Sequence, residues 1–416
     1  MIVSILGLGY IGLPTAAVLA SKEVKVFGVD VNQNVVDTIN RGEIHIIEQE
    51  LDILVHKAVQ DNYLEAVMNP VKSNVYIVAV PTPFKDNYEP DLSYVESATK
   101  SIAKVLEKGN LVILESTSPV GTTEKMMKWI SQERPDLSLP KFGDDKFKAD
   151  IAVAHCPERV LPGQVVRELV ENDRIIGGVS TQCAQRALDF YKIFVEAECL
   201  ITDCRTAELS KLVENSFRDV NIAFANELSL ICDKLNINVW ELIRLANRHP
   251  RVNILQPGPG VGGHCIAVDP WFVINSAPDQ AKLIRTARLV NDSKPLFVLN
   301  KVNQAVQVSG KDKSELSIAL LGLTFKPDID DLRESPALSI ARNIESMGFK
   351  SILLVEPNID TLPYGFESEN VELLELIQAV KIADIVVLLV NHDSFKSMDL
   401  SFLSKKQVID TRGIWS

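Results

Sequence analysis

The chain has 416 residues, 46% of them hydrophobic and 24% charged, with a formal net charge of −12. This length exceeds what one hydrophobic core supports, so we expect two or three domains. The acidic balance argues against nucleic acid or an anionic membrane as the main partner, although local Arg and Lys residues can still bind phosphate. Apolar runs such as Ile385–Val390 are far shorter than the ~20 residues that span a bilayer. Because no basic leader follows Met1 and the six cysteines are scattered, we expect a cytoplasmic protein with reduced thiols.

The first half of the chain alternates short apolar runs with amphipathic stretches, which is typical of a parallel sheet with crossover helices. The pattern predicts strands at Ile2–Leu6, Val24–Val29, Val75–Val80, Leu111–Leu114, Ile151–Ala154 and Arg174–Gly178. It predicts helices at Ile11–Ser21, Leu92–Leu106 and Thr122–Ile130. From about Thr206 to Leu235 one long helix is expected, because this stretch contains neither Pro nor Gly.

The second half begins with another helix, Val239–Asn247, and a Gly/Pro-rich segment, Gln256–Gly263. Further helix is expected to about Val308, followed by a polar linker at 309–314. After the linker the pattern predicts a helix from Pro336 and strands at Ile318–Gly322, Ile352–Val355, Ile385–Val390 and Val408–Asp410. We therefore predict an α/β fold in which two open sheets flank a helical central domain, with domains at 1–204, 205–308 and 309–416.

A glycine-rich turn, Gly7-Leu8-Gly9-Tyr10-Ile11-Gly12, joins the first predicted strand to a helix. Its glycines permit a tight turn, a close approach of the backbone to a pyrophosphate, and close packing of helix and strand. Asp30 ends the second strand, where a carboxylate accepts a hydrogen bond from a ribose 2′-hydroxyl and repels a 2′-phosphate. This register favours NAD over NADP. It also argues against the alternative, in which the glycine turn binds no nucleotide.

Two threonines follow neighbouring predicted strands. Thr82 lies in Val80-Pro81-Thr82-Pro83, and Thr117 lies in Glu115-Ser116-Thr117-Ser118-Pro119. Ligands of open α/β sheets bind at the carboxyl ends of strands, so both hydroxyls are candidate cofactor contacts. Ordinary turn chemistry explains either threonine taken alone.

Cys265 directly follows the glycine-dense run Pro257–His264 and precedes Asp269. Most free cysteines are small buried hydrophobes. Cys265 differs, because glycines have no side chains that would block the approach of a substrate to its thiol. A zinc site through His264 and Cys265 is the other interpretation. We reject it and expect no metal, because adjacent side chains rarely bind one ion and no second Cys/His cluster completes the site.

The long helix carries a second cluster at helical spacing. Glu208, Lys211, Asn215, Arg218 and Ile222 fall on one face. Such stripes are usually solvated charged faces, but Asn is a poor helix former in mid-helix. A convergent Lys and Asn can instead handle protons and stabilise an oxyanion.

Along nearly its whole length the chain resembles the UDP-glucose/UDP-mannuronate dehydrogenases, a family of nucleotide-sugar 6-dehydrogenases. The segments that carry the resemblance are GLGYIG, VPTP, ESTSPVG, CPERVLPG, AELSKLVENSFRDVN, RHPRVNILQPGPGVGGHCIAVDP and GLTFKPDIDDLRES. The resemblance implies that both open sheets are Rossmann-like, the first binding NAD and the last binding the UDP-sugar. It also implies a dimer formed through the helical centre, and an enzyme that uses two NAD per sugar.

The resemblance assigns roles to particular residues. Cys265 would add to an aldehyde and form a thiohemiacetal and then a thioester, which splits one hard oxidation into two easier steps. Lys211 would transfer protons together with Asn215, Glu158 would assist hydrolysis of the thioester through water, and Asp269 would support the site. Besides Gly7, Gly9, Gly12, Asp30, Thr82 and Thr117, the expected cofactor contacts are Tyr10, Ile11 and Arg333.

The substrate segments favour a sugar with an acetamido group. Where UDP-glucose enzymes typically carry Asn-Pro-Glu-Phe-Leu, this chain has Cys156-Pro157-Glu158-Arg159-Val160, and an Arg adds donors that Phe lacks. Taken together, the substrate segments are most similar to those of the subfamily that oxidises UDP-N-acetyl-D-mannosamine to the uronate for surface glycans. The expected substrate contacts are Arg159, Val160, Lys211, Asn215, Arg218, His249, Arg251, Gly262, Phe325 and Lys326. In the family the arginine at the position of Arg251 can come from the neighbouring subunit.

Other functions stay open at this point. UDP-N-acetylglucosamine or UDP-glucose are alternative substrates. A β-hydroxyacid dehydrogenase shares a Rossmann domain, a long helix and a lysine, but needs neither Cys265 nor a second Rossmann-like domain. A non-catalytic NAD-binding regulator would have no use for Cys265 and Lys211.

Overall fold

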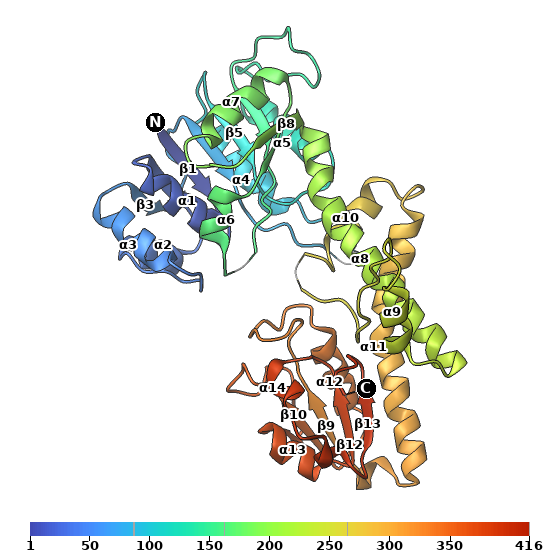
Figure 1. Cartoon of the computed structure of the whole chain (residues 1–416). Helices are drawn as coiled ribbons and strands as arrows, with labels where there is room; N and C mark the ends of the chain where they lie inside the picture. The colour runs from blue at the N-terminus through green and yellow to red at the C-terminus, as the bar shows by residue number, and fades with distance from the viewer. Residues whose placement is uncertain (86–87, 162, 264, 416) are drawn as a thin grey trace. The chain divides into compact units, whose positions relative to one another are not determined.

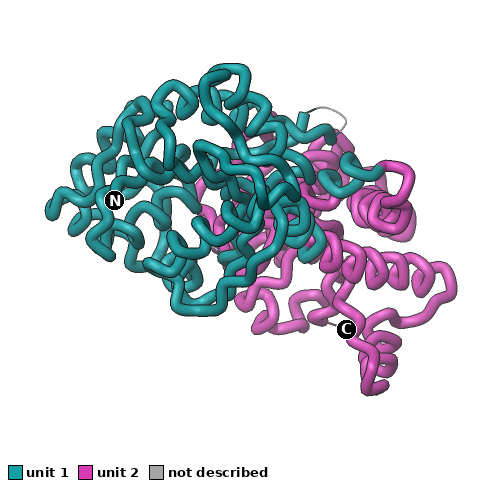
Figure 2. Tube along the Cα trace, turned by 90° about the horizontal axis from the view of Figure 1, so that it is seen from above, with its two compact units in different colours: residues 1–214, 271–277 teal, residues 215–270, 278–416 magenta. Residues whose placement is uncertain are grey.

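The computed structural model describes residues 1–85, 88–161, 163–263 and 265–415 (Figure 1). It divides into two compact units, coloured separately in Figure 2. The first unit joins Met1–Glu214 to Trp271–Ala277, and the second joins Asn215–Pro270 to Pro278–Ser416. Among the described residues, no helix combines the length and the apolar character needed to cross a membrane.

The first unit is built on one large sheet. Its strand order is β3-β2-β1-β4-β5-β6-β7-β8, and every neighbouring pair is parallel except β6 and β7. The strands are β1 (Ile2–Leu6), β2 (Lys25–Val29), β3 (Leu64–Val67), β4 (Val75–Val78), β5 (Leu111–Leu114), β6 (Ala152–His155), β7 (Arg174–Gly178) and β8 (Cys199–Asp203). The central strands are buried on both faces, as expected for a parallel sheet with crossover helices.

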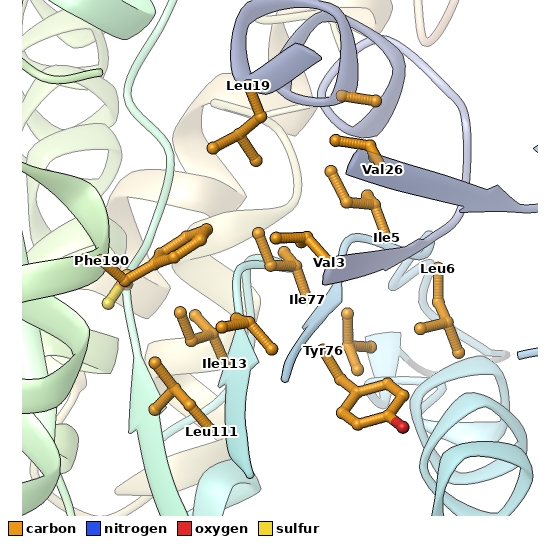
Figure 3. Close-up of a cluster of buried hydrophobic side chains, with 14 of the residues drawn as sticks. Val3, Ile5, Leu6, Leu19, Val26, Tyr76, Ile77, Leu111, Ile113 and Phe190 are labelled. Atoms are coloured by element: carbon orange, nitrogen blue, oxygen red, sulfur yellow. The ribbon is translucent and has the colours of Figure 1, made fainter. Parts of the chain in front are cut away.

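Helices connect these strands and cover the sheet. They are α1 (Gly12–Ser21), α2 (Gln33–Asn40), α3 (Leu51–Gln60), α4 (Ser93–Ala103), α5 (Thr122–Glu133), α6 (Val165–Glu171) and α7 (Thr181–Tyr191). Figure 3 shows part of the core, where Val3, Ile5 and Ile77 from the sheet pack with Leu19 from α1. Polar caps set two helix starts, since Asn32 accepts from the backbone of α2 and Ser180 accepts from that of α7.

A long helix, α8 (Cys204–Leu235), runs from the first unit into the second. The helices α9 (Val239–Ala246), α10 (Asp269–Ser276) and α11 (Lys282–Ser309) follow it. Within the second unit α8 packs on α11 through buried polar pairs. Arg288 Nη1 lies 2.6 Å from Asp219 Oδ1, and Asn226 donates to Asn291 at 2.8 Å. Most charges and amides of this seam are thus paired, although Asp219 Oδ2 and Arg288 Nε have no hydrogen-bond partner among the described residues.

The second unit also contains a parallel sheet, ordered β11-β10-β9-β12-β13. Its strands are β9 (Ser317–Leu321), β10 (Ser351–Val355), β11 (Val371–Leu373), β12 (Ile385–Leu388) and β13 (Gln407–Asp410). The remaining helical segments are α12 (Pro336–Glu345), α13 (Leu376–Ile382), α14 (Asp393–Lys396) and the 3₁₀ turns Lys313–Glu315 and Leu400–Leu403.

This second sheet repeats the start of the first. The order β11-β10-β9-β12-β13 matches β3-β2-β1-β4-β5. Gly7 and Gly322 occupy equivalent turns, each with φ of 91°. Each donates its N–H at 2.8 Å to the last residue of the neighbouring strand, Val29 or Val355. The predicted fold class is therefore confirmed: two open Rossmann-like sheets and a helical central region.

Most of the predicted elements are confirmed, with ends that shift by up to three residues. The strand expected at Val75–Val80 ends at Val78, and the long helix expected from Thr206 begins at Cys204. The sequence pattern did not indicate β3, β8 or β11. The domain division at 204 and 308 stays a prediction.

Candidate active site

The glycine turn after β1 has the shape that a pyrophosphate needs. A Cβ on Gly7 would lie 2.6 Å from the carbonyl oxygen of Ala79, and a Cβ on Gly12 would lie 1.8 Å from that of Gly7. These two glycines are therefore required for close packing. Beside Gly9 there is nothing within 4 Å, so the backbone there is open to an incoming phosphate. Tyr10 and Ile11 lie in the same turn, immediately before α1.

Asp30 lies where a dinucleotide ribose is recognised. It follows β2, and its Oδ2 accepts the Leu8 N–H of the glycine turn at 3.0 Å. Its Oδ1 accepts the Asn32 N–H at 2.9 Å. The turn and the acid are thus fixed to each other, as NAD binding requires. His45 is a neighbour that the motifs did not indicate, and burial lowers its pKa, partly opposed by the charge of Asp30.

The two predicted threonines lie at adjacent strand ends. The Thr82 hydroxyl donates to the Thr117 carbonyl at 2.6 Å, joining the loops after β4 and β5. The residues present therefore fit an NAD molecule at this edge: a turn open beside Gly9, an acid fixed to that turn, and two threonines at adjacent strand ends.

The segment after β6 carries Glu158, Arg159 and Val160. Glu158 is buried, and its Oε2 lies 2.7 Å from Arg174 Nη2. Arg159 donates to Glu214 Oε1 at 2.8 Å and to the carbonyl of Asp173. Val160 packs against the core of the first unit.

Glu48 holds the end of this segment and was missed from the sequence. Its buried carboxylate accepts the N–H groups of Gly163 at 2.7 Å and Val165 at 2.8 Å. It thereby caps the start of α6. No motif surrounds Glu48, and its partners lie more than 110 positions away along the chain.

The polar stripe of α8 separates into two parts. Glu208 and Lys211 belong to the first unit, whereas Asn215, Arg218 and Ile222 belong to the second. Glu208 is buried and accepts from Gly121 and Thr123 at the start of α5, so its role is structural.

Within the second unit Asn215 joins the region of Cys265. Asn215 Nδ2 donates to Asp269 Oδ2 at 2.6 Å. The Asp269 N–H in turn donates to the Cys265 carbonyl at 2.9 Å, where α10 begins. Asp269 thus connects two other predicted catalytic residues, contacting Asn215 through side chains and Cys265 through the backbone.

Cys265 differs from the other five cysteines in its exposure. It is exposed, Cys199 is half-buried, and the remaining four are buried. Burial raises the pKa of the Cys204 thiol to about 12, and it raises the pKa of Cys156 further. Since the thiolate is the nucleophile, these buried thiols are inert, and Cys265 is the thiol that a substrate can reach.

The glycine-dense loop packs against the segment 325–336 of the same unit. A Cβ on Gly262 would lie 2.4 Å from the Glu334 carbonyl oxygen, and one on Gly263 would lie 2.8 Å from the Phe325 ring. Gly263 N–H donates to the Arg333 carbonyl at 3.2 Å. Gly262, Phe325 and Arg333 are therefore brought together. His264 lies outside the described residues.

The other predicted contacts of this unit lie on its surface. Lys326 is exposed near Phe325, and the Arg333 guanidinium pairs with Asp331 at 2.6 Å. His249 and Arg251 are exposed on a loop that the Asn247 side chain closes through two bonds to Ile254.

The chain matches three models of one family. They are described as the NAD binding domain (residues 1–195), the central domain (205–293) and the UDP binding domain (319–416) of the UDP-glucose/GDP-mannose dehydrogenase family.

Relatives of known name match this chain along nearly its full length. The chain is 62% identical over 395 residues to a UDP-N-acetyl-D-mannosamine dehydrogenase of Campylobacter jejuni, covering 94% of this chain and 96% of the relative. It is 58% identical to an NDP-N-acetyl-D-galactosaminuronic acid dehydrogenase of Ralstonia nicotianae, covering 100% and 96%. The solved UDP-D-ManNAc dehydrogenase of Pyrococcus horikoshii matches with a TM-score of 0.87 at 40% identity, covering 100% and 96%. This chain, with its glycine turn, Asp30 and exposed Cys265, belongs to the UDP-glucose/GDP-mannose dehydrogenase family and is an NAD-dependent UDP-sugar dehydrogenase.

Proposed function

We propose that the chain oxidises UDP-N-acetyl-D-mannosamine to UDP-N-acetyl-D-mannosaminuronate with two NAD per sugar. The observation that carries this proposal is the exposed Cys265 linked to Asp269 and Asn215, because a simple alcohol dehydrogenase needs no such thiol. The 62% identical relative supports the choice of sugar. The 58% identical relative named for an N-acetylgalactosaminuronic acid favours a second candidate, the galacto sugar. Both names describe acetamido sugars.

The proposed chemistry divides among residues of this chain. Bound NAD would supply the acceptor for each hydride. Cys265 adds to the aldehyde to form a thiohemiacetal, whose oxidation gives a thioester. Lys211 takes the alcohol proton, Asn215 donates to the developing oxyanion, and Asp269 orients Asn215 through their 2.6 Å bond. Glu158 directs the water that releases the acid.

Arg159 supports an acetamido substrate. It carries five N–H donors, more than its bonds to Glu214 and the Asp173 carbonyl use. A donor at this place suits the amide carbonyl of an N-acetyl group. We propose Val160, Arg218, His249, Arg251, Gly262, Phe325 and Lys326 as the other substrate contacts, and Tyr10, Ile11 and Arg333 as further cofactor contacts.

We also propose that the chain forms a dimer through α8. Along one face of this helix Phe217, Phe224 and Ile231 recur every seven residues and are 73%, 53% and 47% exposed. Exposed apolar rows of this kind mark protein interfaces. The scattered and mostly buried cysteines fit a cytoplasmic enzyme, and the proposed functional domains are 1–204, 205–308 and 309–416.

A panel of UDP-sugars with NAD tests the choice of substrate. We expect UDP-N-acetylmannosamine to be used best, UDP-N-acetylglucosamine and UDP-N-acetylgalactosamine less well, and UDP-glucose very poorly. A site built to hydrogen-bond a polar group rejects analogues that lack the group, because its own donors are left unpaired. Arg159→Phe should weaken use of the acetamido sugar more than it changes NAD affinity. UDP-glucose as the best substrate would overturn the proposal on specificity.

A further inference from the structure

Three buried charged side chains form a cluster that includes Glu158. Arg174, the first residue of β7, places Nη2 2.7 Å from Glu158 Oε2 and Nη1 3.3 Å from Glu115 Oε1. Glu115 directly follows β5. The side chains of Arg174, Glu115 and Glu158 are only 3%, 0% and 7% exposed. One guanidinium therefore bridges two carboxylates that water hardly reaches.

Aromatic rings hold the guanidinium in this place. Arg174 Cζ lies 4.6 Å from the centre of the Tyr191 ring and 5.7 Å from that of Phe194. The Tyr191 hydroxyl, at the end of α7, donates to Glu115 Oε1 at 3.1 Å. Cys156 is the further titratable group that faces Glu115. Arg174 can therefore turn neither toward solvent nor away from its two partners.

Glu158 makes one hydrogen bond and one ion pair, and its Oε2 lies near Arg174 without hydrogen-bond geometry. Its Oε2 faces Arg174, and its Oε1 accepts the Arg159 N–H at 2.7 Å. The ion pair and the hydrogen bond together favour one orientation of this buried carboxylate. Such fixing is what general base catalysis requires, because the base must be within hydrogen-bond reach of the proton it takes.

The charges of the cluster do not cancel when both carboxylates are ionised. Burial raises the pKa of Glu115 to about 7, against the lowering effect of the Arg174 charge and with the raising effect of the Glu158 charge. Among the described residues, Glu115 Oε2 has no hydrogen-bond partner. Near neutral pH Glu115 thus holds a proton part of the time, and Arg174 then keeps only the ion pair with Glu158 to hold it in place. Apolar residues of the same volume often stabilise a fold as well as buried ion pairs do, so stability alone does not account for this cluster.

We propose that Arg174 and Glu115 are positioning residues that orient Glu158 for hydrolysis of the Cys265 thioester. This inference rests on the proposed function. In that step the water oxygen bonds to the thioester carbon, and the C–S bond breaks with its electron pair going to the Cys265 sulfur. Glu158 takes one water proton and returns it to solvent, the thiolate takes up one proton from solvent, the remaining water proton leaves from the carboxylic acid, and no oxidant is consumed.

Rapid-quench kinetics of the full chain with NAD and UDP-N-acetylmannosamine test the proposal. In Arg174→Lys a single ammonium cannot bridge both carboxylates, so hydrolysis should slow while both oxidations continue. We expect a burst of two NADH per subunit, a steady-state rate lower by about 10- to 100-fold, and a sugar thioester on Cys265 detected by mass spectrometry. This loss of rate is part of the ~10²–10⁴-fold acceleration that a positioned general base contributes.

Glu115→Gln keeps the shape of the cluster and serves as the second variant. It should show the same burst with a milder loss of about threefold to tenfold, as part of the same contribution of the base. The inflection near pH 7 expected in the kcat profile of the wild type should be absent, because Gln does not titrate. Arg134→Lys is the matched control, since Arg134 of the same unit holds the Ala103 and Leu106 carbonyls. It should show neither a burst nor a thioester.

Two results would overturn the inference. Arg174→Lys could match Arg134→Lys in kcat, or it could slow the first NADH without any covalent species. If instead the wild type releases one NADH per sugar and Cys265 never carries the sugar, the proposed function falls, and this inference falls with it.

Discussion

We expect Asp30 to determine which dinucleotide the glycine turn accepts, because its carboxylate lies beside the turn. In Asp30→Ser the repulsion of a 2′-phosphate is removed. We expect the ratio of kcat/KM for NAD over NADP to fall at least about tenfold, since ~1.4 kcal/mol corresponds to a factor of ten. Steady-state kinetics with both cofactors measure this ratio. Equal use of the two cofactors by the wild type would remove Asp30 from this role.

Cys265 is the residue on which the proposed four-electron oxidation depends. Cys265→Ala should abolish uronate formation, because no thiol remains to form the thioester. In Cys265→Ser the poorer nucleophile can form an adduct but releases it very slowly, so intact-mass spectrometry should find the sugar on the protein. Cys232→Ser is the matched control, because Cys232 lies buried in α8. Full activity of Cys265→Ala would exclude the thioester.

At the scale of elements, the cluster between β5, β7 and α7 makes stability depend on pH. The folded state raises the pKa of Glu115 to about 7, from an ordinary value of 4.5. The contribution of Glu115 to the free energy of unfolding is therefore complete below about pH 4.5 and is lost as the pH rises through 7. At 1.36 kcal/mol per unit the loss is roughly 3 kcal/mol at most.

Urea unfolding at pH 5 and pH 8 tests this linkage. The wild type should lose more free energy of unfolding between the two pH values than Glu115→Gln, which cannot ionise. An equal change in both proteins would show that Glu115 does not titrate in this range.

Elements buried on both faces could be predicted from the sequence. The run Val75–Val78 is wholly buried, so its apolar pattern is unbroken and the strand was predicted. β8 lies at the edge of its sheet, is mostly exposed, and shows no such run. β11 is also an edge strand and has only three residues. Such strands form because a neighbouring strand offers hydrogen bonds, which a local pattern does not record.

The residues of the candidate site likewise fall into those that the sequence could indicate and those that it could not. Gly7, Asp30 and Cys265 could be found because each belongs to a local motif. Glu48 and Glu115 could not, because their partners lie far away along the chain: 115 positions for Glu48 and Gly163, and 59 for Glu115 and Arg174. Only the folded chain brings these groups together.

For the whole molecule, the exposed face of α8 predicts a dimer that activity requires. Phe217→Asp with Phe224→Asp places two charges on the proposed interface, so the dimer should dissociate. Sedimentation velocity should show monomers, and turnover should fall because the resemblance implies that an arginine at the position of Arg251 can come from the partner. Tyr364→Asp is the control, since Tyr364 is 97% exposed and lies away from α8 along the chain. A monomeric wild type with full activity would contradict the dimer.

The four-electron oxidation is tested by counting NADH against sugar. A limiting amount of UDP-N-acetylmannosamine should yield two NADH per sugar and one uronate, with no free aldehyde trapped by hydroxylamine. This stoichiometry follows from Cys265, which retains the aldehyde until the second hydride has left. One NADH per sugar, with aldehyde in solution, would show a simple alcohol dehydrogenase and contradict the role given to Cys265.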